Sequence, residues 1–347
     1  MPSDRPASPG STHGRRSPRC RRVMVLGATG TIGRATVRAL VRRGHDVVCF
    51  VRPRRAPGDA RSRGGLELLL PGTTVRVGDV LSPASLERDA FAAEAFDVLV
   101  SCLASRTGVP SDAWAIDHQA HVHALAAARR AGVRQVVLLS AICVQKPMLA
   151  FQHAKRAFEQ ALVESGLVYS IVRPTAFFKS LSGQVERVRN GKPYLVFGDG
   201  RLTACKPISD ADLAAYIADC IDDVGRHDRV LPIGGPGNAI TPREQGEYLF
   251  RLFDRKPRFR QVPVALLDTI AGVLGAAGRF SPALGAKAEL ARIGRYYATE
   301  SMLVLDPATN RYDADATPST GTETLFEHYA RLARGEVENE RGDHAVF

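Results

Sequence analysis

The feature that most constrains this chain is a run of three glycines, each three residues after the one before, in the sequence GATGTIG at residues 27–33. A β-branched apolar run, residues 23–28, leads into these glycines, and a segment with helical periodicity, residues 31–44, continues from them. A glycine-rich turn between a buried strand and a helix is typical of a βαβ unit whose helix N-terminus binds phosphate. The run therefore predicts a parallel sheet with a dinucleotide site at its first turn.

The three glycines have different tasks in such a turn. Gly27 permits the tight turn, Gly30 lets the backbone approach a pyrophosphate, and Gly33 allows the helix to pack closely on the strand. The N–H groups of the first helical turn then face the phosphates. The residues expected to contact the cofactor here are Gly27, Thr29, Gly30, Thr31, Ile32 and Gly33.

The chain continues to alternate short β-branched runs with helical segments as far as Pro174. This alternation predicts an α/β fold with a doubly wound parallel Rossmann sheet. After Pro174 the rhythm changes to short strands and isolated helices, which predicts a smaller C-terminal substrate-binding lobe interleaved with the end of the sheet. The predicted strands cover residues 23–28, 46–52, 74–80, 97–105, 135–141 and 169–174, and the main predicted helices cover 31–44, 113–132 and 151–166.

The end of the second predicted strand indicates which dinucleotide binds. An NAD site usually places Asp or Glu there to hold the ribose 2′-hydroxyl, whereas this strand ends in Arg52 and has no acid nearby. A guanidinium suits a 2′-phosphate, so the position favours NADPH, although a solvated arginine loop would look the same. After the third strand, Asp79 and Val80 are expected near the adenine, unless Asp79 only caps a turn.

The net charge of +11 raises the question of nucleic-acid binding. Residues 1–22 hold six arginines and one aspartate in a Pro/Ser/Gly-rich context, and we expect them to form a disordered basic leader rather than a binding surface. No apolar core of a secretory signal is present; a transit peptide, an extended translation start and a plain tail all fit. The other expected divisions are an NADP-binding core (23–175), a substrate-side lobe (176–335) and a frayed tail (336–347).

The six cysteines are scattered, without a C-x-x-C pair or a Cys/His cluster. Several lie inside apolar runs, where a free thiol behaves as a small hydrophobe. We therefore expect a reduced compartment and no metal site in the protein.

The helix after the fifth strand differs at one position from the catalytic motif of short-chain dehydrogenases. Short-chain dehydrogenases place a Tyr-x-x-x-Lys pair here, with a serine upstream, and the tyrosine exchanges a proton with a carbonyl or alcohol oxygen. This chain keeps Ser140 and Lys155 but has Phe151 at the tyrosine position. Carbonyl reduction by that route is therefore not expected. Either the chain binds NADPH without catalysis, or its substrate needs no acid at an oxygen, as in reduction of a carbon–carbon double bond conjugated to a large π-system.

Several long runs carry a specific resemblance. They are LLSAICVQKPMLAFQHAKRAFEQAL, SIVRPTAFFKSLSGQVE, ACKPISDADLAAYIADCI and RYYATESMLV. In these runs the chain closely resembles the divinyl chlorophyllide 8-vinyl reductases, an atypical, NmrA-like short-chain dehydrogenase family, and the resemblance extends over about residues 23–335. It implies NADPH-dependent reduction of the 8-vinyl group of divinyl chlorophyllide or protochlorophyllide to ethyl. The chain would thus act in chlorophyll or bacteriochlorophyll biosynthesis.

The resemblance also suggests roles for individual residues. Lys155 would hold the nicotinamide ribose and stabilise developing negative charge, with Ser140 orienting nicotinamide or substrate. Phe177 and Phe178 follow the sixth strand and would stack on the macrocycle, although core packing is an equal alternative. Lys179 and Lys206 would pair with the substrate's propionate. The alternative for each is an ordinary surface lysine. Any magnesium would belong to the tetrapyrrole substrate.

Two further expectations concern location and function class. The longest apolar stretch, residues 262–278, is short for a membrane span, but it would allow loose membrane contact. We expect a cytoplasmic or membrane-peripheral protein of a phototrophic bacterium, or a plastid protein if the leader is a transit peptide. The alternative function is a non-catalytic NADP(H)-binding regulator or assembly subunit.

Overall fold

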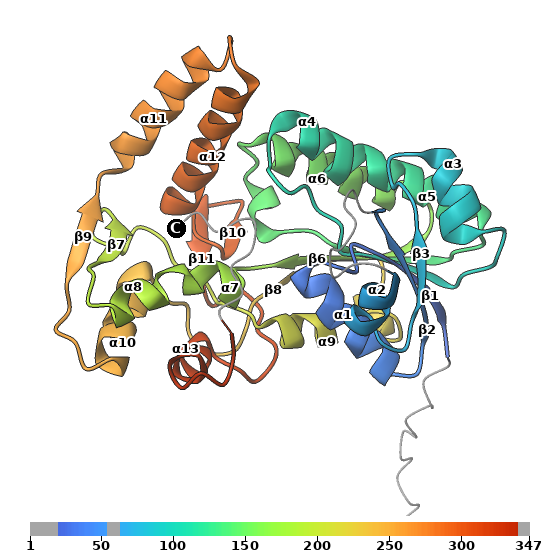
Figure 1. Ribbon diagram of the computed structural model, residues 1–347, viewed down its shortest axis with the longest axis horizontal. Helices are drawn as coiled ribbons and strands as arrows, with labels where there is room; N and C mark the ends of the chain where they lie inside the picture. The colour runs from blue at the N-terminus through green and yellow to red at the C-terminus, as the bar shows by residue number, and fades with distance from the viewer. Residues whose placement is uncertain (1–19, 54–62, 339–347) are drawn as a thin grey trace, which may run out of the picture.

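The computed structural model describes residues 20–53 and 63–338, so residues 1–19 of the expected leader and 339–347 of the expected tail lie outside the described residues. A seven-stranded parallel sheet, in the order β3-β2-β1-β4-β5-β6-β8, forms the core of the larger of two lobes, on the right in Figure 1. The predicted fold class is confirmed. The strands are β1 (Arg22–Leu26), β2 (Asp46–Val51), β3 (Thr74–Val77), β4 (Val98–Ser101), β5 (Gln135–Leu139), β6 (Val168–Pro174) and β8 (Arg229–Ile233).

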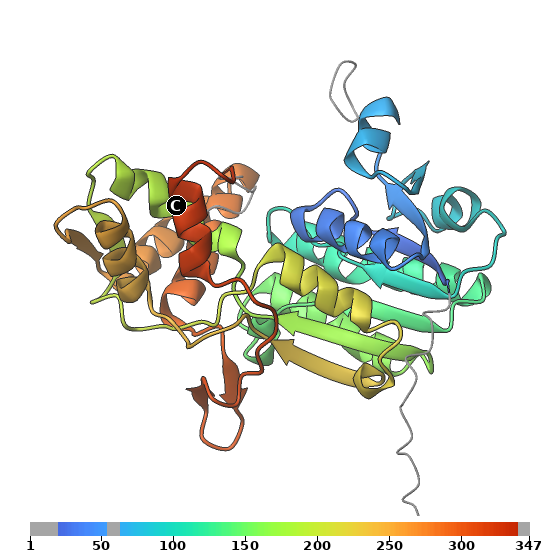
Figure 2. The ribbon, with the colours of Figure 1, turned by 90° about the horizontal axis from the view of Figure 1, so that it is seen from below.

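Helices cover both faces of the sheet (Figure 2). The central strands are buried on both faces and read as continuous apolar runs, as expected for a parallel sheet. One face packs on α1 (Thr31–Arg42) and α9 (Asp210–Asp219), and the other on η1 (Leu86–Phe91), α5 (His121–Arg130) and α6 (Ala150–Val163). The shorter helices of this part are α2 (Arg63–Leu69), α3 (Pro83–Ser85), α4 (Pro110–Ala113), η2 (Trp114–Ala120), η3 (Ile142–Gln145) and η5 (Val224–Arg226).

Some boundaries differ from those expected. The third strand was expected over 74–80 but ends at Val77, because Gly78 packs under the Phe50 ring and the Asp79 carboxylate accepts a hydrogen bond from the Leu81 N–H that closes a turn. The predicted helix 113–132 begins earlier, at Pro110, where proline suits the first helical turn. It then passes through the π-helix η2.

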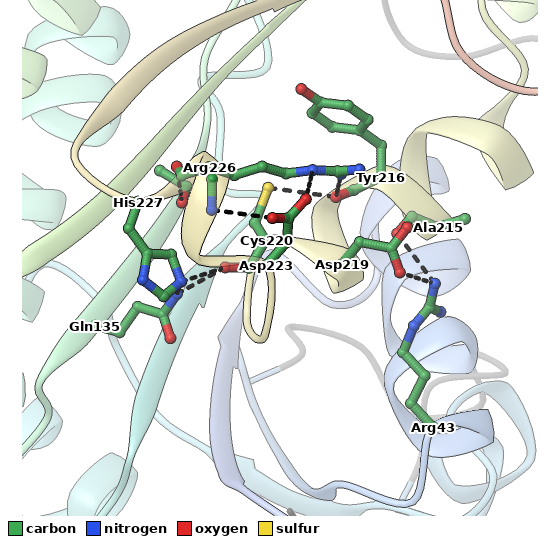
Figure 3. Close-up of polar contacts among 11 residues, drawn as sticks. Arg43, Gln135, Ala215, Tyr216, Asp219, Cys220, Asp223, Arg226 and His227 are labelled. Atoms are coloured by element: carbon green, nitrogen blue, oxygen red, sulfur yellow. Dashed lines mark hydrogen bonds and ion pairs between the residues drawn. The ribbon is translucent and has the colours of Figure 1, made fainter. Parts of the chain in front are cut away.

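The C-terminal end of α9 is tied to the sheet and to α1 by polar contacts (Figure 3). Gln135, on β5, donates to the Cys220 carbonyl at 2.8 Å, and Arg43, at the end of α1, donates to Asp219 at 2.5 Å. Arg226 lies over the Tyr216 ring, 4.0 Å from its centroid. These contacts fix an element that follows Pro174 in the chain onto the sheet formed before it.

The second lobe has its own core around Tyr329, which is fully buried and donates to the Leu181 carbonyl. Two of its helices, α11 and α12, form a hairpin that projects away from the sheet (Figure 1). The elements of this lobe are α7 (Phe178–Leu181), η4 (Ser182–Gln184), α8 (Val185–Arg189), β7 (Tyr194–Phe197), α10 (Pro242–Leu252), β9 (Phe259–Val262), α11 (Val264–Ala277), α12 (Pro282–Thr299), β10 (Val304–Asp306), β11 (Arg311–Asp313) and α13 (Leu325–Ala333).

The chain crosses between the lobes three times, at residues 174–178, 205–209 and 233–240, and we call these segments the neck. They are hydrogen-bonded to one another: the Thr175 N–H donates to the Ile233 carbonyl at 3.0 Å, and the Gly235 N–H donates to the Lys206 carbonyl at 3.2 Å. A Cβ at Gly235 would lie 1.9 Å from the backbone oxygen of Pro207. Only glycine therefore allows the second and third crossings to approach so closely.

Candidate active site

The glycine-rich turn has the geometry that the sequence predicts. Gly27 has a φ of +73°, and a Cβ there would lie 2.5 Å from the backbone of Cys102 at the end of β4. A Cβ at Gly33 would lie 2.0 Å from the Gly27 carbonyl oxygen, so this glycine lets α1 start directly against the turn. Gly30 is different, because the nearest atom to its would-be Cβ is 3.4 Å away. Folding therefore requires glycine at 27 and 33, and the space beside Gly30 is free for a ligand.

The N-terminus of α1 fits a phosphate group. Gly30 caps the helix without a side-chain hydrogen bond, and the first turn contains no acidic residue. The N–H groups of this turn and the positive end of the helix dipole therefore face an open cradle. A cation also reaches it, because the Lys179 ammonium donates to the Thr31 hydroxyl at 2.7 Å. Thr29 is half-buried, and Ile32 is buried beneath the turn.

The parallel strands β2 and β3 end at the same edge of the sheet as this turn. Arg52 is exposed and directly follows β2, where a 2′-phosphate would lie. Asp79 follows β3, and its carboxylate closes the turn at Leu81. The Val80 side chain is buried against η1 and the sheet. Contact of Asp79 and Val80 with the adenine stays a prediction.

Ser140 and Lys155 lie together, lining one small cavity with Asp117, His121 and Phe158. The Lys155 ammonium forms an ion pair with the Asp117 carboxylate at 2.9 Å, and the Asp117 side chain is fully buried. The same carboxylate oxygen accepts from the Ser105 N–H at 3.2 Å. The second Asp117 oxygen and the Ser140 hydroxyl are buried without a hydrogen-bond partner. Buried polar atoms are usually hydrogen-bonded, so these two unpaired atoms beside a lysine mark the cluster as a candidate site.

His121 closes the inner side of this cavity. Its Nδ1 contacts the Ile116 carbonyl at 2.9 Å, and its Nε2 contacts the Ser101 hydroxyl at 2.8 Å. Burial, together with the positive charge of Lys155, lowers the pKa of His121 to about 4. A neutral imidazole donating to the carbonyl through Nδ1 accepts at Nε2 from the serine. At neutral pH this histidine is therefore uncharged.

The sequence analysis did not identify Asp117 or His121. Both lie within the predicted helix 113–132, four residues apart, so they share one helical face. The available signal was an acidic residue, Asp117, in an otherwise largely apolar stretch of this helix. An Asp at such a position requires a partner. The partner, Lys155, lies on another helix.

The aromatic residues divide between the core and the neck. Phe151, at the tyrosine position, is half-buried and packs against the cluster that contains Ile142 and Leu149. Phe178 is 3% exposed and lies in the core of the second lobe, 5.1 Å from the His328 ring. Phe177 is half-buried and pairs with Ile208 in the neck. Of the two residues expected to stack on a macrocycle, Phe178 thus has the packing of a core residue.

Lys206 and the buried tyrosine Tyr296 both make contacts that support the structure. Lys206 donates to the Thr317 carbonyl at 2.9 Å, which ties the neck to the segment before α13. The Tyr296 hydroxyl donates to the Cys143 carbonyl at 3.0 Å, and burial raises the pKa of this phenol above its usual value. Tyr296 therefore anchors α12 against the loop after β5.

Comparisons with known proteins agree with this geometry. Residues 27–224 match the NAD(P)H-binding family model. A relative from Oryza sativa subsp. indica, named divinyl chlorophyllide a 8-vinyl-reductase, chloroplastic, is 50% identical over 94% of this chain and 82% of its own length. A relative of the same name from Cucumis sativus is 49% identical over 96% of this chain and 81% of its length. The fold is that of an NADPH-dependent quinone oxidoreductase from Escherichia coli (TM-score 0.63, 20% identity, covering 89% of this chain and 99% of that one).

Proposed function

The chain belongs to the divinyl chlorophyllide a 8-vinyl-reductase family, and from that premise we propose that it reduces the 8-vinyl group of divinyl chlorophyllide, or of its protochlorophyllide precursor, to ethyl with NADPH. The observation that carries the proposal is the site around Lys155. The cavity contains the lysine and the serine of a reductase, whereas the sequence has Phe151 at the position of the proton-donating tyrosine. That combination suits a reaction in which no oxygen receives a proton.

The residues that would hold the cofactor follow the edge of the sheet. The turn at 27–33 and the N-terminus of α1 would bind the diphosphate, and Arg52 the 2′-phosphate. Lys155 and Ser140 would face the nicotinamide ribose. When bound, NADPH supplies the hydride that adds to the vinyl carbon.

The protein's own contribution at the reacting end is electrostatic. Asp117 holds the Lys155 side chain in one position, where its ammonium stabilises negative charge that develops as the vinyl group accepts hydride. The conjugated macrocycle delocalises most of that charge, so a strong acid at an oxygen is not required, and a weaker acid or water would supply the proton that completes the ethyl group. Phe151, which packs against Ile142 and Leu149, has no proton to donate.

The test is an anaerobic absorption assay on the purified full chain with divinyl chlorophyllide and either NADPH or NADH. We expect the Soret and red bands to shift to those of the monovinyl pigment, faster with NADPH. Lys155→Met should reduce kcat/KM by about 100-fold or more, whereas Lys192→Met, at an exposed lysine outside the site, should not. Tight NADPH binding with no spectral change would instead support a non-catalytic NADP(H)-binding regulator.

We also propose that the α11–α12 hairpin docks loosely on an anionic lipid surface. Within the described residues no helix is long and apolar enough to cross a membrane. The hairpin nevertheless exposes Leu266, Ile270 and Val273 along one face of α11, and Phe280 at its tip is 91% exposed. Exposed apolar side chains gathered in this way indicate an interaction surface.

The charges of the hairpin favour an anionic surface. Arg292 and Arg295 are paired with Glu289 and Asp268. Arg279 and Lys287 are exposed and form no ion pair in the described part of the chain. Two unpaired cations beside an apolar tip match an interface in which side chains enter the acyl boundary and cations meet lipid phosphates.

Sedimentation with phosphatidylglycerol vesicles tests the docking. We expect the wild-type chain to pellet with these vesicles and less with phosphatidylcholine vesicles, and Phe280→Glu to stay in the supernatant. Leu68→Glu is the matched control, since Leu68 is 85% exposed on α2, outside the hairpin. Equal pelleting of both variants would overturn the docking proposal. Such docking would place the chain at a membrane surface in a phototrophic bacterium, or in a plastid if residues 1–22 direct it there.

A further inference from the structure

Lys179 lies at the cofactor turn, not in a substrate pocket. It follows β6 on the short helix α7, 148 residues after Thr31 in the chain, and its ammonium donates to the Thr31 hydroxyl at 2.7 Å. Thr31 is the first residue of α1, directly after Gly30. The charged atom of Lys179 thus lies where the diphosphate of a dinucleotide meets the helix N-terminus.

The backbone around Lys179 is held firmly. Phe178, its neighbour, is buried in the core of the second lobe, and its N–H donates to the Ile208 carbonyl in the neck. The Ser182 hydroxyl donates to the Phe178 carbonyl at 2.8 Å and closes the turn of α7. The Lys179 side chain therefore extends to the turn from a well-held backbone, and little conformational entropy is lost when a ligand binds.

The electrostatics of this position indicate a missing anion. The N-terminus of a helix carries a partial positive charge, which disfavours a cation beside it. The first turn of α1 has no acidic residue, and Lys179 forms no ion pair in the described part of the chain. A cation, a helix N-terminus and an open glycine cradle converge on one place, and a diphosphate satisfies all three.

We propose that Lys179 binds the diphosphate of the dinucleotide and not the carboxylate of the pigment; this inference rests on the proposed function and extends its cofactor site. Lys179 is then a contact between the second lobe and the cofactor. Arg52 and Lys179 divide the recognition: Arg52 faces the 2′-phosphate that only NADPH has, and Lys179 faces the diphosphate that NADPH and NADH share.

The experiment measures dissociation constants of NADPH and NADH for the full chain, by nucleotide fluorescence and without pigment. Lys179→Met should weaken both nucleotides by the same factor, about tenfold or more, so that their affinity ratio is unchanged. Arg52→Gln should weaken NADPH alone. Lys179→Arg should restore affinity to within about threefold of wild type. Lys179→Met should also flatten the dependence of NADPH affinity on salt, because one charge is removed.

Lys192→Met is the control, as an exposed lysine of the same lobe. Its affinities should equal those of the wild-type chain, and unchanged melting temperatures without nucleotide would show that each variant is folded. Wild-type nucleotide affinity in Lys179→Met, with a raised KM for the pigment, would overturn the proposal in favour of carboxylate binding. Failure of the wild-type chain to bind NADPH would instead contradict the proposed function itself.

Discussion

Single residues at the site combine burial with charge in a way that couples folding to pH. Lys155 and Asp117 form an ion pair whose carboxylate is fully buried, and His121 lies beside them as a neutral ring. Removing one partner of such a pair leaves the other charge uncompensated in the interior. A charged His121 would likewise be a buried charge without a partner. The pKa of His121 is lowered for this reason, and the ring stays neutral.

Stability should therefore fall between pH 6.5 and about 4. The pKa of His121 is about 4 in the folded protein and 6.5 as a model value, because burial and the nearby Lys155 disfavour the charged ring. Below pH 6.5 the unfolded chain takes up a proton that the folded chain does not, so the free energy of unfolding decreases as pH falls. The contribution of this one group is about 3 kcal/mol, fully present above pH 6.5. Urea unfolding at a series of pH values measures it.

The comparison that isolates His121 is His121→Gln against His153→Gln. His153 is exposed on α6, so its replacement should leave the pH dependence as it is. His121→Gln should make the curve shallower by up to one proton. Equal slopes in the two variants would show that the acid sensitivity comes from other groups, such as His45 and His328, whose pKa values burial also lowers.

At the scale of elements, the glycines in the turn between β1 and α1 meet two different requirements, one for close packing and one for ligand binding. Gly33 serves packing, since a Cβ there would lie 2.0 Å from the Gly27 oxygen, whereas Gly30 has room for one. The same residue type thus meets a folding demand at one position and a binding demand at the other.

We expect Gly33→Ala and Gly30→Ala to fail in different assays. Gly33→Ala forces α1 away from the turn and should lower the free energy of unfolding by about 2 kcal/mol or more. Gly30→Ala should fold with near wild-type stability, yet bind NADPH at least about tenfold more weakly, because its methyl group occupies the phosphate cradle. Thermal unfolding and nucleotide titration of both variants check this. A stable Gly33→Ala, or a Gly30→Ala that binds NADPH normally, would contradict the assignment.

Much of the sheet could be predicted from the sequence because its signals are local. Apolar runs and the glycine turn placed six strands of the sheet within a few residues of their true bounds. The contacts of Lys179 could not be predicted, because its partner Thr31 is 148 residues away. The pair Phe177–Phe178 gives the same local signal at both positions. In the structure Phe177 pairs with Ile208, and the next side chain, Phe178, enters the core. This long-range pairing is not visible in the local sequence.

At the scale of the whole molecule, cofactor binding should stabilise both lobes, since Lys179 joins the second lobe to the cofactor turn. NADPH at 100 times its dissociation constant should add about 2.7 kcal/mol to the free energy of unfolding. NADH at the same concentration should add less, because Arg52 and Pro53, the described residues that directly follow β2, include no acid for the ribose 2′-hydroxyl. Differential scanning fluorimetry compares the two. An equal rise in melting temperature with both nucleotides would contradict a preference for NADPH.

The neck also sets how the two lobes can move. A single connecting segment would let the lobes rotate relative to each other. Here three crossings are hydrogen-bonded to one another, and Gly235 lies directly against the Pro207 backbone, so rotation and sliding of the lobes are both opposed. The hydrogen-bonded backbone of the neck therefore limits thermal motion of one lobe relative to the other. We therefore expect the two lobes to keep the same relative position when a ligand binds. A change in that position would require breaking the hydrogen bonds that join the three crossings.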